Sequence, residues 1–159
     1  MASDLENTLH LQLKDGLVVI ELLPEVAPDH VAQIKALARE GFYDGIVFHR
    51  VIEGFMAQTG DPTGTGMGGS ERPNLKAEFN ATPHVRGTVS MARSSSPNSA
   101  NSQFFICFDD AEFLNGQYTV WGQVVEGMEF VDAIKKGAKH DNGSVSNPDK
   151  IISLRVAAD

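Results

Sequence analysis

The segment from Phe48 to Asp61, FHRVIEGFMAQTGD, brings together side chains that could do chemistry. It supplies a permanently charged guanidinium at Arg50, an amide at Gln58, and apolar groups at Phe55 and Met56. A rigid cationic donor beside an apolar wall could hydrogen-bond a substrate in dry surroundings. The same residues also fit a plainer interpretation, in which Phe55 and Met56 belong to the core and Arg50 is a surface charge.

A glycine-rich run from Gly64 to Gly69 matches the G-x-G-x-x-G pattern of dinucleotide-binding loops. That pattern binds a pyrophosphate when a strand precedes it and a helix opens at its end. Here Asp61-Pro62 comes before the run, and residues 70–74 after it show no helical periodicity. This context argues against a nucleotide-dependent enzyme. The glycines indicate a loop that folds tightly or passes close to a ligand.

The rest of the sequence contains no recognisable catalytic or metal-binding pattern. The five histidines lack the paired spacing of metal ligands, and no Cys/His cluster is present, so we expect no metal and no cofactor. His49 precedes Arg50 in an apparent strand, so these two side chains should face opposite ways. The serines at 94–96 lack the elbow motif and the base of a serine nucleophile.

The composition is that of an ordinary globular protein, and we expect one domain over residues 1–159. A net charge of −8 argues against general affinity for nucleic acid or for an anionic membrane surface. No stretch approaches the ~20 apolar residues that span a bilayer. The segment Met1–Asn7 is polar, unlike a secretory signal, and the single Cys107 cannot form an internal disulfide. We therefore expect a cytoplasmic protein and, since no apolar stripe is left over, a monomer.

Short apolar runs with strand character recur along the chain, separated by Gly, Pro, Asn and Ser clusters. Residues 9–13 alternate, turn at Asp15-Gly16 and continue through 17–20, which indicates a hairpin. The other strand candidates are Ile46–Val51, Phe55–Thr59, Thr88–Ala92, Gln103–Phe108, Val120–Val125 and Ile151–Val156. Only two segments have helical periodicity, one from Pro28 to Gly41 and one from Met128 to Gly137.

These elements predict a mainly β fold, a closed eight-stranded antiparallel β-barrel capped by two α-helices. Many strands with two isolated helices and no regular βαβ alternation argue against a doubly wound parallel sheet. Closure is economical because it removes exposed strand edges. Residues 60–82 and 93–102 form irregular stretches of the length typical of functional loops, and residues 137–148 are expected to form a solvated connection.

The ordered motifs of this chain resemble the cyclophilin family of peptidyl-prolyl cis/trans isomerases. Residues 48–61 are similar to the family signature F-H-R-x-I-x-G-F-M-x-Q-x-G-D. The likeness continues through 64–69, RGTVSMAR at 86–93, SQFFI at 102–106, 113–114, VWGQV at 120–124 and EGM at 126–128. It covers Thr8 to Val156 and resembles the compact bacterial form more than the eukaryotic one. The resemblance implies the same eight-stranded barrel with two helices.

The resemblance also implies an activity, the isomerisation of X–Pro bonds in proline-containing peptides and in unfolded or folding proteins. Arg50 would be the main catalytic group, and Gln58 would place it or the substrate carbonyl. The proline pocket and the edge along which the substrate backbone lies would be formed by Phe55, Met56, Gly66, Ala92, Arg93, Ser94, Gln103, Phe105, Phe113, Leu114 and Tyr118. Within that set, Arg93 would act mainly through its peptide group.

Two positions depart from the best-known family members. Phe113 stands where many relatives have Trp, and Tyr118 stands where many have His. Phe113 keeps an aromatic wall but lacks the indole N–H that contacts cyclosporin in the family. We predict that catalysis is retained and that cyclosporin binding is weak. Trp121, farther along the chain and within a strand, is expected to pack in the core.

A second class of function stays open, a non-catalytic proline-peptide binding module or holdase chaperone that uses the same groove. The combination of apolar and polar groups favours the enzyme, because a pure binder has no chemical need to keep all of them together. That combination is Arg50, Phe55, Met56, Gln58 and Phe105.

Overall fold

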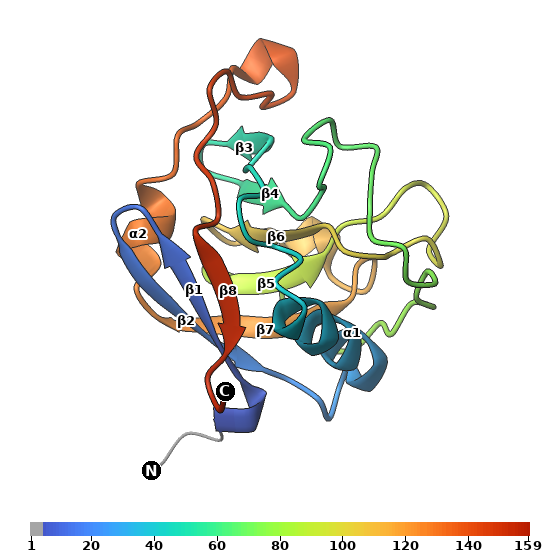
Figure 1. Cartoon of the computed structure of the whole chain (residues 1–159). Coiled ribbons are helices and arrows are strands. Elements are labelled where there is room, and N and C mark those ends of the chain that lie inside the picture. The colour runs from blue at the N-terminus through green and yellow to red at the C-terminus, as the bar shows by residue number, and fades with distance from the viewer. Residues whose placement is uncertain (1–4) are drawn as a thin grey trace.

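The structure is a computed structural model that describes residues 5–159. Part of the Met1–Asn7 segment, which was predicted to differ from a secretory signal, therefore lies outside the described residues. Eight strands form one antiparallel sheet that curls around the core (Figure 1). They are β1 (Thr8–Leu13), β2 (Gly16–Leu22), β3 (Arg50–Ile52), β4 (Met56–Thr59), β5 (Thr88–Met91), β6 (Phe104–Cys107), β7 (Val120–Glu126) and β8 (Ser153–Val156). Their order across the sheet is β3-β4-β6-β5-β7-β2-β1-β8.

Two α-helices lie against this sheet, α1 (Pro28–Arg39) beside β8 and α2 (Met128–Asp132) beside β2. Short 3-10 helices occupy Leu5–Asn7, Glu112–Leu114 and Lys139–Asp141. Helix α1 has the expected Pro in its first turn and buries one apolar face. Helix α2 is shorter than expected because its last turn tightens, with Ile134 N–H bonded to the Val131 carbonyl. In the described part of the chain, no helix has the length and apolar character needed to cross a membrane.

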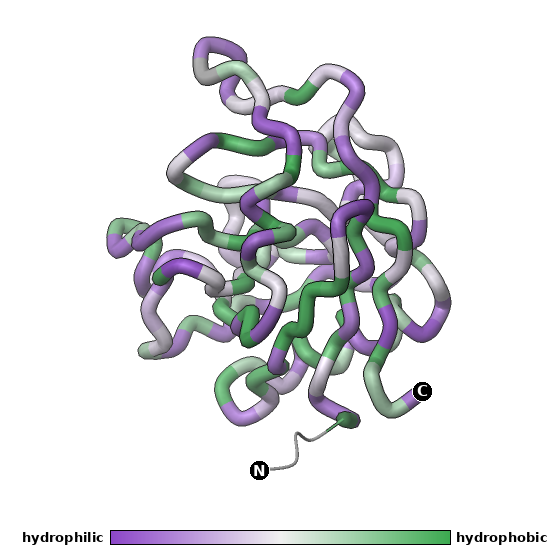
Figure 2. Tube along the Cα trace, turned by 90° about the vertical axis from the view of Figure 1, so that its left-hand side faces the viewer, coloured by the Kyte–Doolittle hydropathy of each residue, from purple (hydrophilic) through white to green (hydrophobic). Residues whose placement is uncertain are grey.

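The expected amino-terminal hairpin is confirmed, with β1 antiparallel to β2 and Leu9 opposite Ile20. The alternation works as predicted, because Leu9, Leu11 and Leu13 all point into the core. Trp121 is fully buried there, as expected. Hydrophobic and hydrophilic residues are interspersed along the trace (Figure 2), and the buried apolar side chains of the strands and both helices form one main cluster.

The expected closed barrel is confirmed only as a single curled sheet. Strands β3 and β8 are its two edges, and no ladder joins them among residues 5–159. Isolated bridges cross this seam instead, pairing Val47 with Lys150 and Arg50 with Ser144. The strand predicted over 46–51 therefore begins only at Arg50, because separate bonds rather than a continuous ladder hold the residues before it.

Candidate active site

Arg50 and Gln58 occupy directly opposite positions on β3 and β4. The turn between these strands contains Gly54 at φ 77°, a left-handed conformation that suits glycine. Opposite residues of an antiparallel pair point to the same face, and here Arg50 Nη1 donates to Gln58 Oε1 at 3.2 Å. The signature segment thus holds the cation against the amide, as the sequence suggested.

Arg50 is also held from the far side by Asn142. Its Nε donates to the Asn142 carbonyl at 3.0 Å, and its Nη2 donates to Asn142 Oδ1 at 3.1 Å. Burial lowers the pKa of Arg50, but the usual value of a guanidinium is so high that the group stays charged at neutral pH. Asn142 was not predicted as a site residue, because the composition of residues 137–148 indicates a solvated connection. The signal was the pair Asn142-Gly143, typical of left-handed backbone, and both residues have positive φ.

A chain of amides continues from Arg50 towards the glycine-rich loop. Gln58 Nε2 donates to Gln103 Oε1 at 3.0 Å, and Gln103 Nε2 donates to the carbonyls of Gly66 and Gly68 at 3.0 and 2.9 Å. A guanidinium can only donate hydrogen bonds, so Gln58 must turn its Oε1 towards Arg50 and its Nε2 towards Gln103. Gln103 in turn directs its Nε2 to the carbonyls of the loop. The position of Arg50 is thereby linked to the conformation of the loop.

Beside Arg50 lies a small hollow of about 130 Å³, named here the proline pocket after the expectation from the sequence. Its floor is apolar, since Met56 and Phe105 are almost fully buried in a cluster that also contains Leu114. The residues that line it are Arg50, Phe55, Met56, Gln58, Ala92, Arg93, Phe105, Leu114 and Tyr118. The structure therefore brings together at one point most of the residues predicted from the sequence.

A larger hollow of about 480 Å³, called here the side pocket, adjoins the proline pocket and shares Gln58, Ala92 and Arg93 with it. Most of its lining residues are polar or glycine, and they include three more predicted residues, Gly66, Ser94 and Gln103. The remaining lining residues are Met67, Gly68, Gly69, Ser70, Asn74, Ser99, Asn101 and Ser102. The two hollows together form one groove, in which apolar side chains gather around Arg50 and Gln58 at one end, while polar residues and glycines predominate at the other.

Two aromatic residues border the apolar end differently. Phe113 is 71% exposed and lines neither pocket, and its ring lies 5.5 Å from that of Phe55. The 3-10 turn at 112–114 explains this, since it buries Leu114 and leaves Phe113 outside. The role of Phe113 as a wall of the proline site stays a prediction. Tyr118 does line the proline pocket, edge-on to Phe105 at 5.7 Å.

The Arg93 side chain lies at the junction of the two pockets. Its guanidinium carbon is 4.6 Å above the centre of the Tyr118 ring, and it donates to the backbone carbonyls of Ser94, Ser95 and Gln117. The sequence analysis expected Arg93 to act mainly through its peptide group. The structure adds a fixed cation to the groove at this position.

The glycine-rich loop is folded around Asp61, whose side chain is 1% exposed. The carboxylate accepts backbone N–H groups from Thr63 at 2.8 Å, Thr65 at 3.0 Å and Gly66 at 2.6 Å. Burial alone would raise the pKa of Asp61, but these hydrogen bonds outweigh it and hold the pKa well below its usual range. The donors that a nucleotide phosphate would need are already used by this carboxylate, which agrees with the argument against a dinucleotide site.

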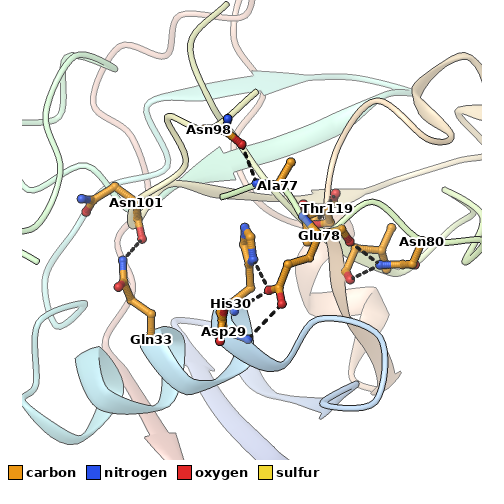
Figure 3. A network of polar contacts seen from close by, with 11 residues as sticks. Asp29, His30, Gln33, Ala77, Glu78, Asn80, Asn98, Asn101 and Thr119 are labelled. Carbon is orange, nitrogen blue, oxygen red and sulfur yellow. Dashed lines mark hydrogen bonds and ion pairs between the residues drawn. The ribbon is translucent and has the colours of Figure 1, made fainter. Parts of the chain in front are cut away.

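Two segments, around Glu78 and around the side-pocket residue Asn101, are tied to α1 by partly buried polar contacts (Figure 3). His30 Nδ1 and Glu78 Oε1 are 2.6 Å apart, and the same carboxylate oxygen accepts the His30 backbone N–H at 2.9 Å. Burial lowers the pKa of His30, although the hydrogen bond to Glu78 opposes the shift. Gln33 donates to the Asn101 carbonyl at 2.8 Å, so the helix also holds a residue of the pocket lining.

Among residues 5–159, no group of three His, Cys, Asp or Glu side chains is placed to hold a metal ion. The groove instead offers the guanidinium groups of Arg50 and Arg93, a chain of hydrogen-bonded amides and a pocket lined by apolar side chains. Such a site can bind and polarise an amide, but its lining contains no carboxylate or histidine to take a proton.

Residues 8–156 match the protein family described as cyclophilin-type peptidyl-prolyl cis-trans isomerase. A curated relative from Brucella suis, named a probable peptidyl-prolyl cis-trans isomerase, is 61% identical, with 99% of this chain and 86% of the relative covered. Peptidyl-prolyl cis-trans isomerase B of Bacillus subtilis is 44% identical over 82% of this chain and 92% of its own length.

Solved structures agree with these relatives. A cyclophilin from Hirschia baltica superposes with a TM-score of 0.89 at 30% identity, covering 100% of this chain and 77% of the other. A cyclophilin-type isomerase from Cryptosporidium parvum, determined in the presence of the dipeptide Ala-Pro, gives a TM-score of 0.86 at 29% identity, covering 94% and 98% of the two chains.

Proposed function

This chain belongs to the cyclophilin-type peptidyl-prolyl cis-trans isomerases, and we propose that Arg50 is the group that catalyses X–Pro isomerisation in it. The observation that carries the proposal is that Arg50 lines the proline pocket beside the apolar side chains of Met56 and Phe105, and is held by Gln58 and Asn142.

The chemistry needs no covalent step. Rotation about an X–Pro bond is slow because amide resonance must be broken, with a barrier of ~18–20 kcal/mol. Uncatalysed exchange takes on the order of 10–100 s. An enzyme need only bind the twisted amide more tightly than either planar isomer.

Twisting the amide localises a lone pair on the prolyl nitrogen. The Arg50 guanidinium donates a hydrogen bond to that nitrogen, and the bond forms only as the amide leaves planarity. The planar amide is also more dipolar than the twisted one, so the apolar walls of the pocket disfavour the ground state. Phe55, Met56 and Phe105 supply those walls and hold the proline ring.

The substrate backbone lies along the segment Ala92–Ser94, which lines the groove. Ala92 N–H is bonded to the Gln103 carbonyl, so this segment is fixed relative to the amide chain. Gly66 and Gln103 border the same segment in the side pocket. The presence of Ala-Pro in the crystals of the Cryptosporidium relative supports a proline peptide as the ligand of this groove.

The magnitudes require more than one contribution. A hydrogen bond to a charged group is worth roughly 1.5–3 kcal/mol net, which is about one to two decades of rate. Turnover near ~10³ per second needs about five decades, or about 7 kcal/mol. Arg50 supplies part of this, and desolvation together with immobilisation of one carbonyl supplies the rest.

The test is an NMR-exchange or protease-coupled assay with an Ala-Pro peptide, comparing the native chain with Arg50→Ala. We expect kcat/KM to fall at least tenfold in a variant whose circular dichroism is unchanged. Arg155→Ala is the matched control, because Arg155 is paired with Asp44 and lines neither pocket. Unchanged turnover in folded Arg50→Ala would overturn the assignment, and a native chain that binds the peptide without accelerating it would point to a holdase.

The proposal extends to the setting of the enzyme. We propose a cytoplasmic monomer that acts on unfolded and folding proteins, supported by the net charge of −8 and by the single cysteine. We also propose that the bridges at Val47 and Arg50 complete the barrel by joining β3 to the segment before β8, which supports Arg50 from outside the sheet.

A further inference from the structure

The arginines of this chain fall into two groups. Four of the six are paired with carboxylates: Arg39, Arg72, Arg86 and Arg155. Within residues 5–159, Arg50 and Arg93 form no ion pair, and these are the two arginines that line the groove. Their hydrogen bonds go to carbonyl and amide oxygens, which carry no net charge, so both cations remain uncompensated.

The groove contains no counter-charge of its own. No Asp or Glu lines either pocket, although the chain as a whole has a net charge of −8. Asp61 lies behind the side pocket, but its carboxylate is enclosed by the glycine-rich loop and bonded to that loop's N–H groups. A cationic groove on an acidic surface is therefore a local feature, and it favours ligands that bring a negative charge to that one place.

Arg93 is the better placed of the two to meet a side chain of the substrate. Arg50 faces the proline pocket, and its guanidinium is bonded to Gln58 and Asn142. Arg93 lies where the two pockets join, with one face of its guanidinium on the Tyr118 ring. One Nη2 hydrogen of Arg93 has no partner among the described residues, because that nitrogen donates only to the Gln117 carbonyl.

We propose that this groove prefers proline peptides that carry Asp or Glu within about three residues of the proline, and that the Arg93 guanidinium recognises that carboxylate. The proposal rests on the function given above and names the substrate class for the same groove. The aromatic ring holds the Arg93 guanidinium in place, so little side-chain freedom is lost when an acidic residue binds. The attraction acts at contact range and weakens with salt.

The experiment compares kcat/KM for peptides that differ at one position near the proline. Glu, Gln and Lys are placed in turn at each of the three positions before the proline and at the position after it. At the favoured position we expect Glu to exceed Gln by about two- to fivefold, and Lys to fall below Gln. Raising NaCl from 20 mM to about 500 mM should reduce the Glu/Gln ratio towards one.

Three variants identify the group responsible. Arg93→Gln should bring the Glu/Gln ratio close to one, and Arg93→Lys should restore much of it. Arg155→Gln, which changes the net charge by the same amount far from the groove, should leave the ratio as it is in the native chain. The ratio is read separately from turnover of the neutral peptide, so loss of isomerase activity and loss of acidic preference are distinct results. A native ratio of one at every position, or a ratio that persists in Arg93→Gln, would overturn the proposal.

Discussion

Asn142 accepts hydrogen bonds from Arg50 with both its backbone carbonyl and its side-chain Oδ1, although 92 positions separate the two residues. The arginine is therefore a donor whose direction is set before a substrate arrives. A loop of the 137–148 segment orients Arg50, because it crosses the seam between β3 and β8 and bonds to β3.

Removing the side chain of Asn142 should weaken catalysis without unfolding the protein. Asn142→Gly keeps the left-handed backbone and the carbonyl bond but deletes Oδ1, so we expect kcat/KM to fall about two- to tenfold. Asn147 also has positive φ in the same segment, and Asn147→Gly is the matched control. The fall should appear in kcat rather than in KM, as measured by NMR exchange at several peptide concentrations. Equal effects from both variants would mean that loop stability, not Arg50, is being measured.

Cutting the amide chain at Gln103 should act on a different kinetic constant. Gln103→Leu removes the bonds to the carbonyls of Gly66 and Gly68 and leaves the amide of Gln58 without an acceptor. We expect KM to rise several-fold because the side-pocket wall loosens, with a smaller loss in kcat because Arg50 keeps Asn142. Gln123→Leu, in β7 and outside both pockets, is the control. A loss confined to kcat would contradict this account.

Cyclosporin should inhibit this enzyme weakly. Phe113 lacks an indole N–H, and its ring lies outside the proline pocket against Phe55. We expect Phe113→Trp to strengthen inhibition about tenfold or more while changing peptide turnover little, as measured by inhibition curves in the coupled assay. Nanomolar inhibition of the native chain would contradict the prediction.

Stability should fall as pH drops below about 6.5. Burial lowers the pKa values of His30 and His84 below those of the unfolded chain. The unfolded chain therefore binds more protons in that window, and the free energy of unfolding falls by at most about 1.4 kcal/mol per pH unit for each histidine. Urea titrations between pH 7.5 and 5 measure this slope.

A variant separates His30 from the other groups. His30→Gln should reduce the slope, because it removes one of the two buried histidines whose pKa is lowered. Asp61 contributes in a different window, because its folded pKa is lowered and its stabilisation is lost only as pH falls below the unfolded value near 4. If the slope is unchanged in His30→Gln, the pH dependence of the free energy of unfolding does not come from His30.

The features that could be predicted from the sequence are those that depend on a local pattern of residues. The hairpin followed from alternation and a D-G turn, and the short segment that contains both Arg50 and Gln58 was recognised as a unit, although their pairing comes from the structure. These features depend on neighbours within a few residues, and the family resemblance added the order of the motifs.

Contacts between distant parts of the chain escaped prediction. His30 and Glu78 are 48 positions apart, and no pattern in the sequence around either residue predicts that the two are in contact. The hydrogen bond from Arg50 to Asn142 also joins distant parts of the chain and has no local sequence pattern. The sequence pattern indicates how many strands exist, and from that number a closed barrel was predicted. Whether the edge strands β3 and β8 bond to each other depends on how far the sheet curls, which the pattern does not show.

The seam between β3 and β8 places Arg50 at the least continuously bonded junction of the sheet. Local opening there would release Arg50 from Asn142 while the hairpin and the buried core stay intact. The free energy that maintains the working geometry is thus separate from the free energy that maintains the fold. Amide protons around Gly143, whose carbonyl accepts Val51 N–H, report the first quantity, and those of β1 and β2 report the second.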